Sequence, residues 1–284
     1  VNYGRVSGSN LAESGGGIAG KNNGTLSNCV NNNTVSGAQY AGGVVGYTIF
    51  PTNTTSNCVN YGDVSSYPID ASQIAGGVVG WHEKGTLSNC VSVGGNVTNT
   101  KGDGTASAGG VVGTCGKEAK ISNCGWLYSQ ENNKGVGSGD DTPEPVSLDQ
   151  TEINESVVVA LIADHMNITL RTGDTAKITL NALPGKQAAF GKYVKNITVP
   201  PDSEKISAKV NEEKGEITLT SLKEGTSALC VSADLYTTDL ASLNPSVDPV
   251  PLSLTIYVSA RRTLGGITLS PEKMNLRVGA SGKF

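Results

Sequence analysis

A Gly-Gly-aliphatic-aliphatic-Gly block recurs four times in the first half of the chain and constrains the fold more than any other feature. Each block is followed by Ser-Asn-Cys, and the period is 26 to 34 residues, with block starts at Gly16, Gly42, Gly76 and Gly109. A phrase that recurs at such a period is typical of stacked repeats, in which each repeat packs against its neighbours. We therefore expect an extended scaffold built coil by coil.

Each repeat is expected to hold three short strands, which in the second full repeat span 43–47, 54–59 and 63–66. Gly and Asn lie between them, and both residues reach positive φ at low cost, as tight corners require. The predicted fold class is all-β, with a right-handed parallel β-helix in the first half. Stacking would then align equivalent side chains in columns, one of valines (Val44, Val78, Val111) and one of larger aliphatics (Leu26, Leu87, Ile121).

Four cysteines occupy one equivalent repeat position: Cys29, Cys58, Cys90 and Cys124. This placement predicts a structural column of small apolar side chains in the core, with free thiols that are mostly buried. Zinc ligands usually come in pairs two to four residues apart, whereas Cys115 and Cys124 are nine apart. We predict no metal site and no cofactor.

The repeat pattern weakens after Cys124, and four segments are predicted: a repeat β-helix at 1–134, a flexible linker at 135–146, an antiparallel β-sandwich at 147–260 and a truncated second sandwich at 261–284. Trp126 and Tyr128 are expected to cap the stack. Alternating strands about ten residues apart indicate the sandwich. The candidates are 157–162, 167–170, 176–180, 196–199, 206–210, 216–222, 227–233 and 251–258.

Composition excludes several classes of function. The formal net charge is −4 and no basic stripe is present, so neither nucleic acid nor an anionic membrane surface is an expected partner. No stretch reaches the roughly 20 apolar residues of a membrane span. The chain opens in mid-repeat, because Val1–Gly8 matches Val59–Ser66, so we expect a piece of a longer protein. We also expect the protein to be a monomer.

The first half resembles the GLUG-type repeat over about residues 1–128. The cleanest copy is Ala75–Gly80 followed by Gly85-Thr86-Leu87-Ser88-Asn89-Cys90. The resemblance implies a secreted or wall-attached bacterial protein of the kind that includes adhesin-like chains. It implies a location outside the cell and names no ligand.

The second half resembles bacterial immunoglobulin-like domains of invasin- and intimin-type adhesins. The matching residues are Leu170–Thr175, Gly215–Thr226 and the closing Leu254–Val258. An insertion at about 235–251 departs from the usual short loop, and its role is not evident from the sequence. The resemblance implies an Ig-like sandwich in a cell-surface protein.

Few residues suggest catalysis. His82 and His165 are the two histidines, and we expect His82 to be an exposed loop residue, since the zinc-protease pattern that it begins lacks its second His. Carbohydrate-cleaving β-helices need clustered carboxylates, whereas the eight acids of the repeat half do not recur on adjacent coils. We predict no catalytic residue.

Tyr47 and Trp81 are the candidate ligand-binding residues. Both directly follow a Gly-rich block, so neighbouring coils would place them side by side as a platform for a sugar ring, or simply as packing between coils. The predicted function is a non-enzymatic bacterial surface module, a display or stalk element that binds host glycan or matrix protein. A passive spacer for a catalytic domain elsewhere and a carbohydrate-active β-helix are the alternatives.

Overall fold

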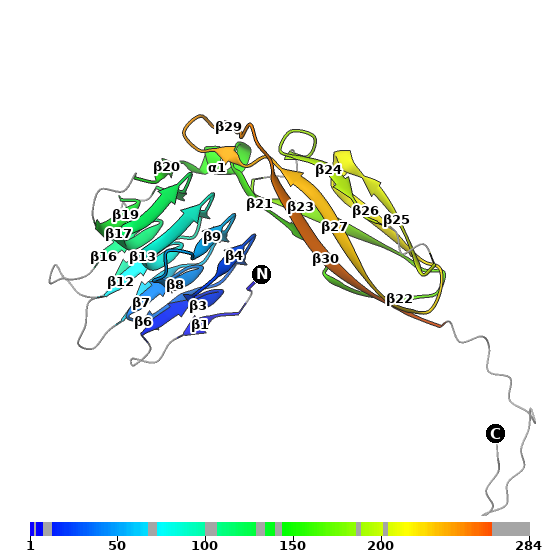
Figure 1. Cartoon of the computed structure of the whole chain (residues 1–284), viewed down its shortest axis with the longest axis horizontal. Coiled ribbons are helices and arrows are strands. Elements are labelled where there is room, and N and C mark those ends of the chain that lie inside the picture. Colours follow the sequence, from blue (N-terminus) through cyan, green and yellow to red (C-terminus); the bar gives the residue numbers. More distant parts are fainter. Residues whose placement is uncertain are drawn as a thin grey trace, which may run out of the picture.

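The computed structural model describes residues 1–2, 4–7, 13–67, 73–99, 107–128, 134–139, 144–185, 189–200 and 204–262. Over these residues the chain is all-β, with helical turns at α1 (Gln150–Glu155) and η2 (Glu212–Lys214). A repeat unit (residues 1–148) and a C-terminal unit (residues 157–262) meet at an angle, with α1 and β29 near the apex (Figure 1). Nearly all of the predicted truncated sandwich at 261–284 lies outside the described residues.

The repeat unit consists of four sheets in which every pairing is parallel and joins strands one repeat apart. The first two sheets contain β1 (Val6–Ser7), β6 (Val35–Ala38), β11 (Val64–Ser66) and β15 (Val97–Asn99), and then β5 (Val30–Asn31), β10 (Val59–Asn60), β14 (Val91–Ser92), β18 (Gly125–Leu127) and β20 (Val146–Leu148). The other two contain β2 (Ser14–Gly16), β7 (Tyr40–Gly42), β12 (Ile74–Gly76) and β16 (Ser107–Gly109), and then β3 (Ala19–Asn22), β4 (Thr25–Ser27), β8 (Val45–Thr48), β9 (Thr54–Ser56), β13 (Val79–Ser88), β17 (Val112–Ser122) and β19 (Val136–Gly139).

The strands of one repeat are shorter and more numerous than the three predicted. The predicted strand at 43–47 starts too early, because Gly43 forms a corner between β7 and β8 where an added Cβ would lie 2.1 Å from the Gly77 carbonyl oxygen. The predicted strand at 54–59 is interrupted at Asn57, which has a φ of 54°. A left-handed residue ends a strand, so β9 and β10 belong to different sheets.

Equivalent residues stack in columns through the core. Val44, Val78 and Val111 are fully buried, and backbone hydrogen bonds of 2.8–2.9 Å link them, as predicted. A second column is polar: Asn31 donates to the side chain of Asn60 at 2.8 Å, and both amides are fully buried. Such a column is stable because each amide satisfies the next one.

The predicted linker at 135–146 is wrong for its described ends. Val136 in β19 pairs with Val112, and Val146 in β20 pairs with Gly125, so β19 and β20 add a further rung to the stack. Its glycines serve close packing, since a Cβ on Gly137 would lie 2.5 Å from the Ser107 hydroxyl. Trp126 lies in β18, which β20 covers, and it is buried, which contradicts its predicted role as the cap.

The C-terminal unit has two four-stranded sheets that share one apolar core. All eight predicted strands are present. The first sheet contains β21 (Val158–Ala163), β23 (Thr175–Pro184), β26 (Glu216–Ser221) and β25 (Ile206–Asn211), and the second contains β22 (Asn167–Arg171), β30 (Val250–Arg261), β27 (Gly225–Leu235) and β24 (Val194–Thr198). The pairing of β22 with β30 is parallel, contrary to the all-antiparallel prediction. The two strands are far apart in the chain, so no hairpin turn constrains them to run antiparallel.

The two units are packed together rather than tethered. Asn28 accepts from the Leu161 backbone N–H at 2.8 Å and donates to the Leu161 carbonyl, and Asn57 donates to the Val159 carbonyl at 2.9 Å. These amides pair with the free edge of β21, which is the kind of edge that proteins protect from other strands. The repeat unit therefore recognises the C-terminal unit through its Ser-Asn-Cys asparagines.

The insertion at 235–251 completes this join. It contains β28 (Thr238–Asp239) and β29 (Asn244–Pro245). Its Leu240 is buried in one apolar cluster with Leu148 of β20 and Ile153 of α1. Asn123 donates to the Thr238 carbonyl at 2.7 Å. The end of the stack is thus covered by α1 and the insertion. They take the capping role that was predicted for Trp126 and Tyr128.

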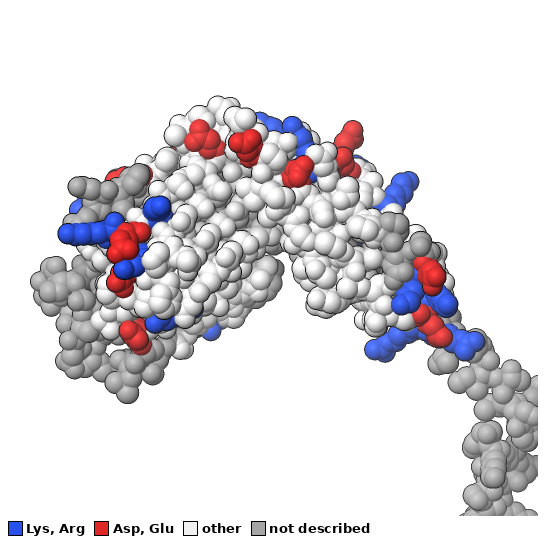
Figure 2. All heavy atoms as spheres, in the orientation of Figure 1, with Lys and Arg blue, Asp and Glu red and all other residues white. Residues whose placement is uncertain are grey.

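Charged side chains are sparse on the face shown in Figure 2, and those of both signs lie close together. No broad single-sign patch is visible among the described residues on that face. This distribution agrees with the small net charge of −4.

Candidate functional site

The predicted aromatic pair forms as expected from the repeat spacing. Tyr47 of β8 and Trp81 of β13 are register partners, and their rings stack with centroids 4.9 Å apart at an interplanar angle of 30°. Tyr40 of β7, which the sequence analysis missed, meets the Trp81 ring edge-on at 4.9 Å. Three aromatic rings from two adjacent sheets therefore form one cluster.

The two members of the predicted platform differ in exposure. Tyr47 is 8% exposed, so most of its ring is used in packing, whereas Trp81 is partly exposed. The Tyr47 hydroxyl donates to the Glu83 carboxylate at 2.5 Å, and burial together with this hydrogen bond raises the pKa of Tyr47. Trp81 is thus the ring that a ligand can reach, and Tyr47 fixes the ring and the carboxylate beside it.

A column of side chains continues on both sides of this pair. Lys21 is the register partner of Tyr47, and its ammonium group lies 5.3 Å from the centre of the Tyr47 ring. On the other side, Thr114 is the register partner of Trp81, and its hydroxyl lies 3.0 Å from that of Ser138. The sequence pattern supports this column, because its members all follow a Val-Gly or Ala-Gly pair.

His82 is buried, contrary to the prediction that it is an exposed loop residue. It lies within β13 and is 1% exposed; its Nδ1 is 2.6 Å from the Thr48 hydroxyl and its Nε2 is 3.3 Å from the Lys120 carbonyl oxygen. Burial lowers the pKa of His82 to about 4. The sequence suggested a corner because of the neighbouring glycines, but the strand continues past Gly85.

The four-cysteine column lies in the apolar core of the repeat unit. Cys58, Cys90 and Cys124 are buried, Cys29 is partly exposed at its end, and all are free thiols. Each thiol lies within 3.0–3.3 Å of the carbonyl oxygen of the serine two residues earlier. Burial raises the pKa of Cys90, so a reactive thiolate is disfavoured there. The sixth cysteine, Cys230, is exposed on the C-terminal unit.

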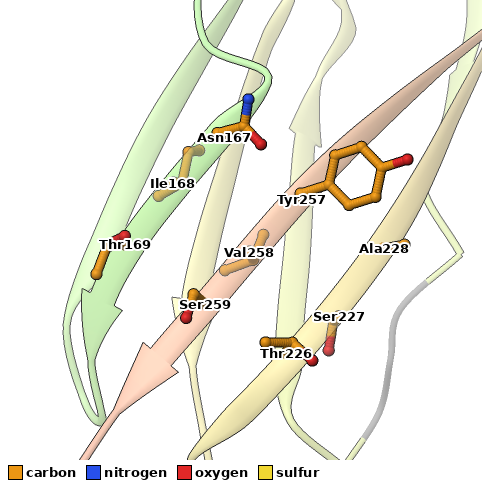
Figure 3. Close-up of a pocket in the computed structure, with 9 residues that line it drawn as sticks. All are labelled: Asn167, Ile168, Thr169, Thr226, Ser227, Ala228, Tyr257, Val258 and Ser259. Carbon is orange, nitrogen blue, oxygen red and sulfur yellow. The ribbon is translucent and has the colours of Figure 1, made fainter.

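A shallow cavity of about 480 Å³ lies on the C-terminal unit, against β22, β27 and β30 (Figure 3). Tyr257 stands at its rim and is 57% exposed, and hydroxyl groups of Thr169, Thr226 and Ser259 line it. None of these side chains is an acid or base suited to catalysis. The cavity is a second surface on which a ligand could be sought.

No helix in the described part of the chain is long and apolar enough to cross a membrane. Within the same residues, no group of three or more His, Cys, Asp or Glu side chains is arranged to hold a metal ion.

No protein-family profile and no curated protein sequence matches this chain. Among solved structures, the surface layer protein SbsC, domains 1–6, is similar at 16% identity and a TM-score of 0.25, over 38% of this chain and 14% of that one. The S-layer protein SbsC domains 4 and 5 is similar at 15% identity and a TM-score of 0.24, over 42% of this chain and 49% of that one. At these scores the likeness supports no conclusion about fold or function.

Proposed function

We propose that this chain is part of a non-enzymatic bacterial cell-surface protein. A right-handed β-helix of GLUG-type repeats and an Ig-like sandwich would form a display or stalk module that binds host glycan or matrix protein. The proposal rests on the repeat motifs and, for ligand binding, on one observation. Trp81 is partly exposed, and Tyr40 and Tyr47 hold its ring in place at 4.9 Å.

A fixed, partly exposed indole is suited to recognition. Its ring is already ordered by packing, so little side-chain entropy is lost when a ligand binds. The carboxylate of Glu83 is held beside it by the Tyr47 hydroxyl at 2.5 Å. An aromatic face next to an oriented polar group is the usual composition of a site for a polar organic ligand.

A second candidate function is a passive spacer, and the packed join between the units supports it. Side-chain amides of Asn28 and Asn57 bind the edge of β21, and Leu240 and Ile153 share a buried cluster with Leu148. A rigid join transmits position along a projecting chain, whether or not the module binds a ligand itself. The two candidates differ in whether the isolated chain has a binding partner.

The test is a binding screen of the purified chain against immobilised host glycans and matrix proteins. Trp81→Ala is compared with Tyr128→Ala, a matched control that removes a 56% exposed aromatic ring elsewhere on the repeat unit. Saturable binding that Trp81→Ala loses and Tyr128→Ala keeps is the expected result, with circular dichroism showing that both variants are folded. Absence of binding by the unaltered chain at high micromolar concentration contradicts the adhesive function and leaves the spacer.

A further inference from the structure

The Trp81 column, defined as Lys21, Tyr47, Trp81, Thr114 and Ser138, has the geometry of a ladder rather than of a single pocket. Each member is the register partner of the next across β3, β8, β13, β17 and β19. Neighbouring strands in a sheet are about 4.8 Å apart, so the five side chains span roughly 19 Å along the stack. The column is therefore long enough for an extended ligand and too narrow for a globular one.

The chemistry changes along the column in a definite order. Its centre is aromatic, and its ends are polar and exposed, with the Lys21 ammonium at one end and the Ser138 hydroxyl at the other. Thr114 and Ser138 place two hydroxyls 3.0 Å apart, and each can donate or accept. An extended molecule that offers a C–H face at its centre and hydroxyls along its length would match this order.

The charges next to the column are balanced. Lys21 and Glu83 carry opposite signs on either side of Tyr47, and the nearby Lys84 ammonium is already paired with Glu118 at 2.8 Å. A strongly anionic chain would meet the Glu83 carboxylate, and a cationic one would meet Lys21. A neutral ligand avoids both repulsions and can hydrogen-bond to both groups.

From these observations we infer that the Trp81 column binds a neutral, extended glycan that lies along the stack and crosses the strands, with one sugar residue for each rung. Trp81 stacks on the central sugar, Glu83 and Lys21 bind hydroxyls on one side, and Thr114 and Ser138 bind hydroxyls on the other. An extended β-1,4-linked chain repeats at nearly the spacing of the rungs. This inference rests on the proposed binding function and gives it a ligand class and an orientation.

The experiment is isothermal titration of the full chain with neutral β-1,4-linked gluco-oligosaccharides of increasing length. Affinity is expected to rise from the disaccharide to the pentasaccharide, and the hexasaccharide should bind no more tightly, because five rungs are then occupied. Trp81→Ala should weaken every member of the series by about tenfold or more, since it removes the central stacking contact. Tyr128→Ala is the control and should leave the series unchanged.

The Ser138→Ala variant tests the orientation, because Ser138 lies two rungs from Trp81. It should weaken the pentasaccharide about threefold to tenfold and leave the disaccharide unaffected, since a disaccharide stacked on Trp81 reaches only the next rung. Equal affinity of the unaltered chain for all lengths overturns the inference while leaving Trp81-dependent binding intact. So does an equal loss of affinity for short and long oligosaccharides in the variant. If the unaltered chain binds none of these oligosaccharides, the inference is wrong, and a matrix protein captured in a Trp81-dependent manner would still support the proposed function.

Discussion

The repeat unit and the C-terminal unit solve the same burial problem in different ways. In the repeat unit each buried residue packs on its own equivalent one rung away, and even buried asparagines are satisfied in this manner, as Asn31 is by Asn60. In the C-terminal unit the core is a single apolar cluster of unlike residues, and polar pairs lie outside it. A substitution in the repeat unit therefore acts on the rungs above and below, whereas one in the C-terminal unit acts on its own neighbours.

The largest contrast is expected at glycines. Gly77→Ala places a Cβ 2.0 Å from the Gly110 carbonyl oxygen and 2.4 Å from the Ser92 hydroxyl, so two rungs must separate. We expect the free energy of unfolding to fall by about 3 kcal/mol or more. Gly173→Ala in the C-terminal unit meets nothing within 4 Å, and its φ of 93° should cost only about 1–2 kcal/mol.

Urea denaturation followed by circular dichroism measures both variants. Gly24→Ala is the control within the repeat unit, because its Cβ would enter open space, and it should change the free energy of unfolding by less than about 1 kcal/mol. A Gly77→Ala variant as stable as Gly24→Ala would show that neighbouring rungs can separate to admit the added Cβ at little cost in free energy. The contrast between the two units would then be lost.

The second contrast is between the two histidines. The pKa of His82 is about 4 in the folded chain and about 6.5 when unfolded, so between these values the unfolded state binds more protons. The stability that depends on neutral His82 is present above pH 6.5 and is lost as the pH falls toward 4, by roughly 3 kcal/mol in total. His165 is exposed on the C-terminal unit and provides the comparison.

Denaturant titrations at several pH values check this expectation. His82→Gln should flatten the fall in the free energy of unfolding between pH 6.5 and 4, because the titrating group is gone. His165→Gln should leave that fall in place. An unchanged pH profile in His82→Gln would assign the acid sensitivity to other groups.

The sequence predicted one unit better than the other for a physical reason. Strand alternation in the C-terminal unit is a local signal, and all eight predicted strands are present. In the repeat unit, identical valines and cysteines predicted the columns, but the rung at 136–139 keeps only a Val-Gly pair, so its glycines suggested a linker. The aromatic pair was predictable from the repeat register, whereas Tyr40 was not, because its equivalents are Ile74 and Ser107.

Contacts between the units were outside the reach of local patterns. Asn28 and Leu161 are 133 residues apart, and nothing in either segment alone indicates that they meet. The corner at Asn28, where φ is 52°, was not predicted either, because the predicted strand at 54–59 runs through its equivalent, Asn57. The Asn28 side chain accepts from Leu161 of β21, so one residue serves both as corner and as contact.

The third prediction separates these two roles at the join. Asn28→Gly with Asn57→Gly keeps residues that tolerate positive φ and removes the amides that bind Leu161 and Val159. We expect a loss of about 2 kcal/mol in coupling, because buried backbone groups of β21 lose their partners. Thermal unfolding should then change from one transition to two, as the units unfold separately.

Asn89→Gly is the matched control for that experiment. Asn89 has a similar φ of 51°, but its side-chain oxygen accepts from Asn123, and among the described residues no hydrogen bond joins its side chain to β21. It should therefore keep the single transition. Two transitions in the unaltered chain would show that the join does not couple the units at all.

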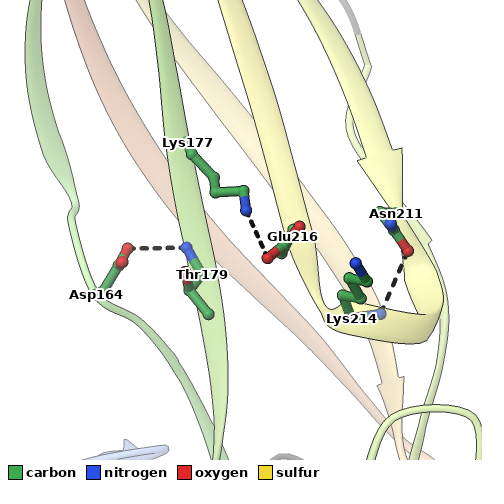
Figure 4. A network of polar contacts seen from close by, with 6 residues as sticks. All are labelled: Asp164, Lys177, Thr179, Asn211, Lys214 and Glu216. Carbon is green, nitrogen blue, oxygen red and sulfur yellow. Dashed lines mark hydrogen bonds and ion pairs between the residues drawn. The ribbon is translucent and has the colours of Figure 1, made fainter.

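The smallest effect is expected from the surface pairs of the C-terminal unit. Figure 4 shows Lys177 reaching across to Glu216, with Nζ and Oε1 2.6 Å apart, and the two side chains are 57% and 24% exposed. Solvent and salt screen such a pair, so its coupling energy should be about 0.2–1 kcal/mol and should fall at high ionic strength. A double-mutant cycle with Lys177→Ala and Glu216→Ala measures it.

The Asn31–Asn60 pair of the repeat unit is the buried counterpart of this surface pair. The hydrogen bond from Asn31 to Asn60 also joins two polar side chains, but both are fully buried, so an unpaired amide there cannot turn to water. A Lys177–Glu216 coupling above about 2 kcal/mol would contradict the view that polar pairs of the C-terminal unit are superficial. A small, salt-sensitive coupling would place the polar contribution to stability in the repeat columns, where each buried amide bonds both to the next rung and to a nearby backbone carbonyl.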